Sequence, residues 1–185
     1  NQMTDGVHIR LTLTRGVKIT SGMDPRLNRS GPTLIVLAEH KPPVYDKTGV
    51  RLITSSVRRF SPDGLDPKIH HSNLIQSILA KIQANQAGVD DALMLDLRSF
   101  VAETNATHVF LVRHRRRIEV DGPASARNSA GRVTAVPEEG QQFSHVELLT
   151  PFCHACPEGI TRAAVLEICR RESIACREAD LSLTD

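Results

Sequence analysis

The chain has 185 residues, enough for one ordinary domain or for one domain with a smaller companion. Apolar residues make up 40% of it and aromatic residues only 3%, so any core is expected to be aliphatic. The formal net charge of +2 argues against a dedicated nucleic-acid or membrane surface, and no stretch has the length and apolarity of a membrane span.

The first part of the chain carries two strand patterns separated by a loop. Residues 7–14 alternate apolar and polar side chains, as a half-buried strand does, and residues 33–38 are a continuous apolar strand. Gly and Pro in 21–32 indicate a long loop. The paired prolines in 41–46 favour extended backbone, so we predict a linker there and a domain boundary between residues 46 and 47.

The second part is predicted to mix strands and helices. A strand over 50–60 and a turn at 61–64 precede a helix that begins near Ser72, an N-cap residue, and ends at Gly88. One face of this helix carries the aliphatic residues Leu74, Ile75, Ile78, Leu79 and Ile82. The remaining predicted elements are strands over 92–96, 100–103, 108–113, 146–150 and 174–177 and a helix over 160–172. Strands clustered before two isolated helices favour an α+β fold.

Residues 114–145 differ from the rest of the chain. They are rich in Arg, Gly, Ser, Pro and Glu and lack apolar periodicity, so we predict a surface loop or a disordered insertion. The basic run at its start is more typical of a solvated charged face than of a polyanion site.

The four cysteines all lie in the last part of the chain and begin with a Cys-x-x-Cys, Cys153 to Cys156. Such a pair raises the question of zinc, but the spacing to Cys169 and Cys176 argues against it. Cys169 falls on the apolar side of a predicted helix, as small buried thiols do. We expect neither a metal site nor disulfides, since nothing in the sequence suggests secretion.

Three separate features have the chemistry that pyridoxal phosphate requires. Gly159-Ile160-Thr161-Arg162 opens an amphipathic run, and free N–H groups at a helix N-terminus bind phosphate. Ile160 and Thr161 are therefore candidate phosphate ligands. Glu103, in Glu103-Thr104-Asn105-Ala106-Thr107, offers a carboxylate for a pyridine nitrogen, and Lys68 offers an amine for an aldehyde.

Together with the segments 8–16, 66–84, 92–96 and 101–110, these motifs resemble those of the class IV, or fold-type IV, pyridoxal-phosphate aminotransferases. The similarity is strongest to the branch of D-amino-acid and branched-chain aminotransferase-like proteins, and it covers nearly everything except 114–145. It implies a two-domain α+β fold truncated at both ends. Residues 1–46 would be the remainder of a small N-terminal domain and its linker, and residues 47–185 an incomplete large cofactor-binding domain.

The resemblance also implies roles for individual residues. Lys68 would form the Schiff base with pyridoxal 5'-phosphate, with Lys81 in the predicted helix as its rival. Lys68 precedes Asn73 by five residues, a longer spacing than in other branches. The shorter spacings fall on Ile69 or His70, neither of which forms an imine. Glu103 would face the pyridine nitrogen.

Two arginines are candidates for binding the substrate. Arg10 and Arg26 are suited to a substrate carboxylate, because a guanidinium group binds carboxylates in a bidentate way. Two departures from the family pattern lie near the site. His108 stands where Asn is usual, and Glu158 brings a negative charge close to a phosphate, which opposes binding.

The implied activity is transamination between a branched-chain or D-amino acid and a 2-oxo acid. The complete protein is expected to be a homodimer in the cytoplasm or an organelle, including the plastid, with no nucleic-acid or membrane partner and without secretion. Two alternatives stay open. One is an aminodeoxychorismate lyase that forms 4-aminobenzoate and pyruvate, and the other is a catalytically silent, truncated homologue.

Overall fold

The computed structural model describes residues 3–42, 48–115 and 145–185. The chain divides into two compact units, Asn1–Gly49 and Val50–Asp185, and each has its own architecture. The predicted boundary between residues 46 and 47 lies outside the described residues.

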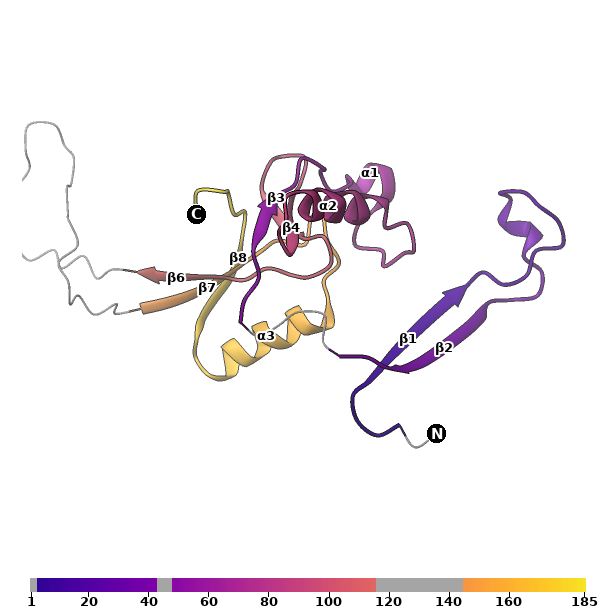
Figure 1. The fold of residues 1–185 in the computed structure, drawn as a ribbon, viewed down its shortest axis with the longest axis horizontal. Helices are drawn as coiled ribbons and strands as arrows, with labels where there is room; N and C mark the ends of the chain where they lie inside the picture. The colour runs from indigo at the N-terminus through magenta and orange to yellow at the C-terminus, as the bar shows by residue number, and fades with distance from the viewer. Residues whose placement is uncertain (1–2, 43–47, 116–144) are drawn as a thin grey trace, which may run out of the picture. The chain divides into compact units, whose positions relative to one another are not determined.

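The first unit is a two-stranded antiparallel ribbon (Figure 1). Strand β1 (Val7–Thr14) pairs with β2 (Thr33–His40) over its full length, with Val7 opposite His40, and a short 3-10 turn, η1 (Pro25–Leu27), lies between them. Both predicted strands are confirmed. Neither strand buries a residue fully, because a ribbon of two strands has no second layer to cover its apolar face.

The second unit holds two three-stranded sheets of the same design. One has the order β3 (Leu52–Thr54), β4 (Asp91–Leu95), β5 (Val101–Thr104), and the other β6 (Leu111–Arg115), β7 (His145–Pro151), β8 (Ala175–Ala179). Each sheet contains one parallel and one antiparallel pair. The parallel pairs are joined by helices α2 (Ile75–Gln86) and α3 (Ile160–Arg171), since parallel strands need a crossover connection. This mixture is the predicted α+β class.

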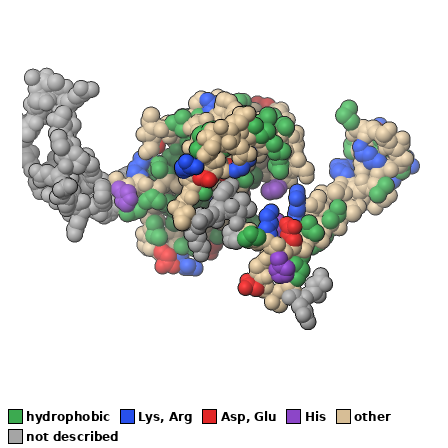
Figure 2. Space-filling view, viewed as in Figure 1, with side chains coloured by type: hydrophobic (Ala, Val, Ile, Leu, Met, Phe, Trp, Pro, Cys, Tyr) green, Lys and Arg blue, Asp and Glu red, His purple; other side chains and the backbone are tan. Residues whose placement is uncertain are grey.

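Two small cores hold the second unit together. Helix α2 buries Ala80 and Ala84 against Ala92 and Met94 of β4. The other core joins the two sheets and consists of Leu95, Val101, Leu149 and Leu181. The aliphatic face predicted for α2 is not the face that packs on the sheet, since its members are between 44% and 53% exposed. Figure 2 shows hydrophobic side chains on the surface of the second unit, in the region where Figure 1 places α2.

Several predicted boundaries change. The strand predicted over 50–60 is limited to β3, because the chain bends at Ser56 and Val57, just after Ser55, whose hydroxyl donates to Gln83 of α2. Ser72 is not the N-cap of α2. That place is taken by Leu74, which makes no side-chain cap bond. The predicted turn at 61–64 becomes the short helix α1 (Pro62–Leu65), capped by Ser61.

The predicted insertion over 114–145 is shorter at both ends. Residues 114 and 115 belong to β6 and residue 145 to β7, where Arg115 lies opposite His145. The remainder, 116–144, lies outside the described residues. Within the described part of the chain, no helix is long and apolar enough to cross a membrane.

Candidate functional site

A cavity of about 800 Å³ lies in the second unit. Four segments line it: residues 59–60, the loop and the start of α2 within 67–77, the end of β5 with the turn after it, and residues 157–160 at the start of α3. Lys68, Glu103 and Ile160, which are far apart in the sequence, all belong to this lining. The structure therefore places three of the predicted site residues around one space.

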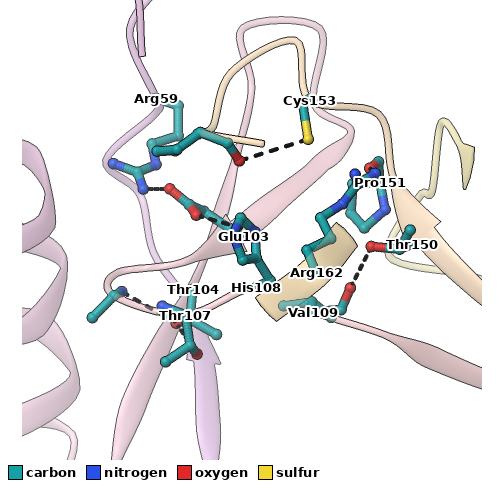
Figure 3. A network of polar contacts seen from close by, with 12 residues as sticks. Arg59, Glu103, Thr104, Thr107, His108, Val109, Thr150, Pro151, Cys153 and Arg162 are labelled. Carbon is teal, nitrogen blue, oxygen red and sulfur yellow. Dashed lines mark hydrogen bonds and ion pairs between the residues drawn. The ribbon is translucent and has the colours of Figure 1, made fainter. Parts of the chain in front are cut away.

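Glu103 lies at the inner side of the cavity. It is 4% exposed and stands near the end of β5, where it is paired with Met94 across the sheet. Figure 3 shows its carboxylate between the Arg59 guanidinium, with which it forms an ion pair, and the ring of His108, whose Nδ1 is 3.8 Å from Oε2. A buried carboxylate is tolerated here because Arg59 compensates its charge.

The turn after β5 explains the Thr104-Asn105-Ala106-Thr107 sequence. The Thr104 hydroxyl accepts hydrogen bonds from the backbone N–H groups of Ala106 and Thr107. The side-chain oxygen of Asn105 accepts a bond at 3.3 Å from the N–H of Ala92, which ties the turn to β4. These bonds hold the chain so that His108 comes back towards Glu103.

His108 is packed against the backbone of Gly159. A Cβ built on Gly159 would lie 2.0 Å from the His108 Nε2, and Gly159 has a φ of +68° that other residues rarely adopt. Burial lowers the pKa of His108, and the nearby Arg162 and Arg59 cations lower it further. The imidazole is therefore neutral near pH 7.

Gly159 is also the N-cap position of α3, and no side chain caps this end of the helix. The first-turn N–H groups thus have no side-chain acceptor, and Ile160, the first helical residue, is 91% exposed. Thr161 follows it in the same exposed turn but is not part of the cavity lining. Arg162 fixes the helix instead: it is 5% exposed, donates to the Pro151 carbonyl at 2.7 Å and pairs with Glu178.

The two candidate lysines occupy different places. Lys68 lies in the loop between α1 and α2, lines the cavity and has its amine 3.8 Å from an Asp66 oxygen, with the side chain 47% exposed. Lys81 is on α2, where its amine donates to the Asp90 carbonyl, and it does not belong to the cavity lining. His70 belongs to the lining together with Lys68.

The predicted substrate-binding arginines are in the first unit. Arg10 is an exposed residue of β1, opposite Leu37. Arg26 is in η1 and forms an ion pair with Asp24 at 2.6 Å, with its own side chain 89% exposed. The assignments of Arg10 and Arg26 to substrate binding remain predictions.

Sequence reasoning missed Arg59. Its only local signal is an Arg-Arg pair before a Ser-Pro turn, which is common on solvated surfaces. In the structure its side chain is 13% exposed and its charge is opposed by Glu103, 44 positions later. Only the pairing of β4 with β5, and of β3 with β4, brings these two residues together.

The cysteines near the site are free thiols. The Cys153 thiol donates to the Pro157 carbonyl at 3.6 Å, and Cys156 is 1% exposed. Burial raises the pKa of Cys156 to about 12. Cys169 is 3% exposed on α3, as predicted for a small buried thiol.

Comparison with known proteins gives consistent matches. A family model described as "Amino-transferase class IV" matches residues 1–185. Over its whole length the chain is 47% identical to branched-chain-amino-acid aminotransferase-like protein 2 of Arabidopsis thaliana, of which it covers 28%.

Two solved structures share the fold. The branched-chain aminotransferase from Thermoproteus uzoniensis, solved with norvaline, matches with a TM-score of 0.72 at 20% identity, over 96% of this chain and 49% of that one. The branched-chain aminotransferase from Thermobaculum terrenum, in its PLP form, matches with a TM-score of 0.67 at 21% identity, over 96% and 48%. The chain spans half or less of each protein it matches here.

Proposed function

We propose that this chain, which belongs to the class IV aminotransferase family, is part of a pyridoxal-phosphate enzyme that transfers an amino group between an amino acid and a 2-oxo acid. The observation that carries the proposal is that Lys68, Glu103 and the start of α3 at Ile160 line one cavity. An amine, a carboxylate and unpaired N–H groups are the three things by which a protein holds this cofactor.

The residues present fit pyridoxal phosphate. The cavity of about 800 Å³ is within the usual size range of small-molecule sites. Glu103 supplies a buried carboxylate for the pyridine nitrogen. The N-terminus of α3 has no side-chain cap bond. Because Gly159 has no Cβ, His108 can pack directly on its backbone, where a Cβ would collide with the imidazole. When bound, the cofactor supplies an electron sink for the carbanion that forms at the amino-acid Cα.

Each residue then has one task. The N–H groups of Ile160 and Thr161 bind the phosphate, and the Thr161 hydroxyl adds a donor. Glu103, held by Arg59, keeps a proton on the pyridine nitrogen. Lys68 would hold the cofactor through its aldehyde and, as a free amine, would carry the proton to and from the substrate Cα. For this, its amine has to turn from Asp66 into the cavity.

The finer assignments rest on the relatives. Branched-chain amino acids are proposed as donors because the Arabidopsis and Thermoproteus proteins carry branched-chain aminotransferase names. D-amino acids remain the other donor class. Residues 1–46 as part of a small domain, residues 47–185 as part of a large one and a homodimeric whole protein are proposed on the same family membership.

The test is covalent labelling of the purified protein. Pyridoxal phosphate is added, the mixture is reduced with borohydride, and the modified peptide is mapped by mass spectrometry. The label is expected on Lys68. Lys68→Ala should lose it and the matched variant Lys81→Ala should keep it, because Lys81 already donates to Asp90 outside the cavity lining. A label on Lys81, no label at all, or full labelling of Lys68→Ala would contradict the assignment.

A second assay separates the reactions. The same protein is incubated with a branched-chain amino acid and 2-oxoglutarate, and in parallel with aminodeoxychorismate. New glutamate supports transamination. Release of pyruvate from aminodeoxychorismate without glutamate formation would make the protein a lyase, and labelling at Lys68 with neither product would leave a cofactor-binding, silent homologue.

A further inference from the structure

Among the described residues, one group of three metal-ligating side chains comes together: Glu103, His108 and Cys156. One ligand atom of each lies within 4.8 Å of those of the other two. Glu103 and Cys156 are buried, and the His108 side chain is 20% exposed. We propose that these three residues bind a Zn²⁺ ion, with a fourth coordination position open to the cavity. This inference goes beyond the proposed function, which uses only Glu103 of the three.

The donor set suits zinc. A thiolate sulfur, an imidazole nitrogen and a carboxylate oxygen are the three ligand types that Zn²⁺ takes in proteins, whereas Mg²⁺ and Ca²⁺ prefer oxygen alone. Metal–ligand bonds of tetrahedral zinc place neighbouring ligand atoms about 3.4–3.6 Å apart. The present separations require side-chain movements of roughly 1 Å, which rotations of Glu103 and Cys156 can supply.

His108 presents the nitrogen that such a site needs. Its Nε2 faces Gly159, so Nδ1 is the atom turned to Glu103. Nδ1 is buried and has no hydrogen-bond partner, and at 3.8 Å from the Glu103 oxygen it is too far for a hydrogen bond. Buried polar atoms without a partner are rare, and an ion between the two residues satisfies both.

Two negative groups face the ion. On binding, the Cys156 S–H bond breaks, the sulfur keeps the electron pair and bonds to Zn²⁺, and the proton leaves to solvent. The thiolate and the Glu103 carboxylate then oppose the two charges of the ion and the single charge of Arg59, which leaves a net charge of +1 on these groups. Of the neighbouring cations, Arg162 is paired with Glu178, and Arg59 pairs with the other oxygen of Glu103 than the one nearest His108.

The sequence groups Cys156 with the other cysteines, but its partners in this cluster come from β5 (Glu103) and from the residues that follow it (His108). A zinc ion here would occupy the carboxylate that the pyridine nitrogen needs. Zn²⁺ and pyridoxal phosphate are therefore expected to compete for Glu103.

The test uses the purified protein, freed of metal with a chelator. Zn²⁺ affinity is measured by competition with a chromogenic indicator for wild type, Cys156→Ser and the matched control Cys153→Ser, which removes the other thiol of the Cys-x-x-Cys. Wild type and Cys153→Ser are expected to bind one Zn²⁺ per chain with equal affinity. Cys156→Ser is expected to bind at least tenfold more weakly. Equal affinities for all three proteins, or a loss in Cys153→Ser as large as in Cys156→Ser, would overturn the proposal.

Two further measurements guard against a variant that fails to fold. Co²⁺ bound to the wild-type protein should show the near-ultraviolet charge-transfer absorption of a thiolate ligand, and His108→Asn should lose it. No such band in wild type would refute thiolate ligation. Added Zn²⁺ should also weaken pyridoxal-phosphate binding in wild type and leave it unchanged in Cys156→Ser. Because cofactor labelling without metal tests the proposed function alone, the two proposals can fail separately.

Discussion

Gly159→Ala tests the contact on which the geometry of the site depends. The change places a Cβ 2.0 Å from the His108 Nε2, at a residue whose φ is +68°. Left-handed backbone costs a residue with a Cβ about 1–2 kcal/mol. Pushing the imidazole away adds an overpacking cost of about 1–3 kcal/mol and disturbs its place beside Glu103. The free energy of unfolding should therefore fall by about 2–5 kcal/mol.

Gly88→Ala is the matched control. Gly88 has a φ of +67°, almost the same as Gly159, but a Cβ there would meet nothing within 4 Å. This variant reports the backbone cost alone, about 1–2 kcal/mol. The difference between the two variants isolates the His108 contact. Thermal unfolding measures it, since about 1 kcal/mol shifts the midpoint by about 2–4 °C in a domain of this size.

A double-mutant cycle completes the test. His108→Ala combined with Gly159→Ala removes the ring that the new methyl group meets, so the double variant should recover the stability lost beyond the Gly88→Ala level. If Gly159→Ala is no more destabilising than Gly88→Ala, or if His108→Ala rescues nothing, the packing of His108 on Gly159 does not hold the site together.

Four other predictions follow from the same site. Glu103→Gln should lower turnover by orders of magnitude, because the pyridine nitrogen loses its carboxylate partner, and should also lower stability, because the largely buried Arg59 loses its counter-charge; a near wild-type rate in a steady-state assay would refute the role. Glu158→Gln should tighten pyridoxal-phosphate binding a few fold at low salt and less at high salt, as a titration at two ionic strengths would show, whereas unchanged affinity at low salt would mean that Glu158 points away. His108→Asn should make the free energy of unfolding less dependent on pH below about pH 6.5. Because the pKa of His108 is lowered in the folded state, the neutral imidazole stabilises the fold above its ordinary pKa, and this stability is lost as the pH falls through the folded-state pKa. Identical pH profiles of wild type and variant in thermal melts would contradict this. Replacing 116–144 by a short Gly-containing turn should keep the melting temperature within a few degrees, because Arg115 and His145 face each other as the last pair of an antiparallel ladder, and a collapse of soluble yield would show that the segment packs as structure.

Several strands and helix ends were predictable from the local pattern, although the burial that the pattern suggests is not always present. The alternation in residues 7–14 and the Gly that follows α2 correspond to β1 and to a helix end with φ of +67°. The pattern fails on α2 itself. Its large aliphatic side chains suggest a buried face, but the helix packs on β4 through Ala80 and Ala84, because close approach of helix and sheet requires small residues.

The sequence motifs of the candidate site were predictable, but the residues that contact these motifs from other strands and loops were not. Lys68, Glu103 and Ile160 can be found from their local sequence, and the structure gathers them around one cavity. Arg59 carries no such signal, and the Cys-x-x-Cys that contains Cys156 points only to the other cysteines. What makes both residues matter is a contact with Glu103 or His108, which lie on another strand or loop. A charged side chain in an Arg-Arg pair looks solvated until sheet pairing places a carboxylate against it.

The position of Glu103 decides which chemistry the cavity can support. One oxygen of its carboxylate pairs with Arg59, the other lies near His108, and the side chain also lines the cavity where a pyridine ring would lie. The ion pair with Arg59 lets the carboxylate remain buried, and its other oxygen can still bind a second cation. A protonated pyridine nitrogen and a zinc ion are both such cations, but they cannot bind it together. His108, at a position where the family resemblance implies Asn, adds the second option, because among the described residues it is this imidazole that offers a metal-binding nitrogen beside Cys156.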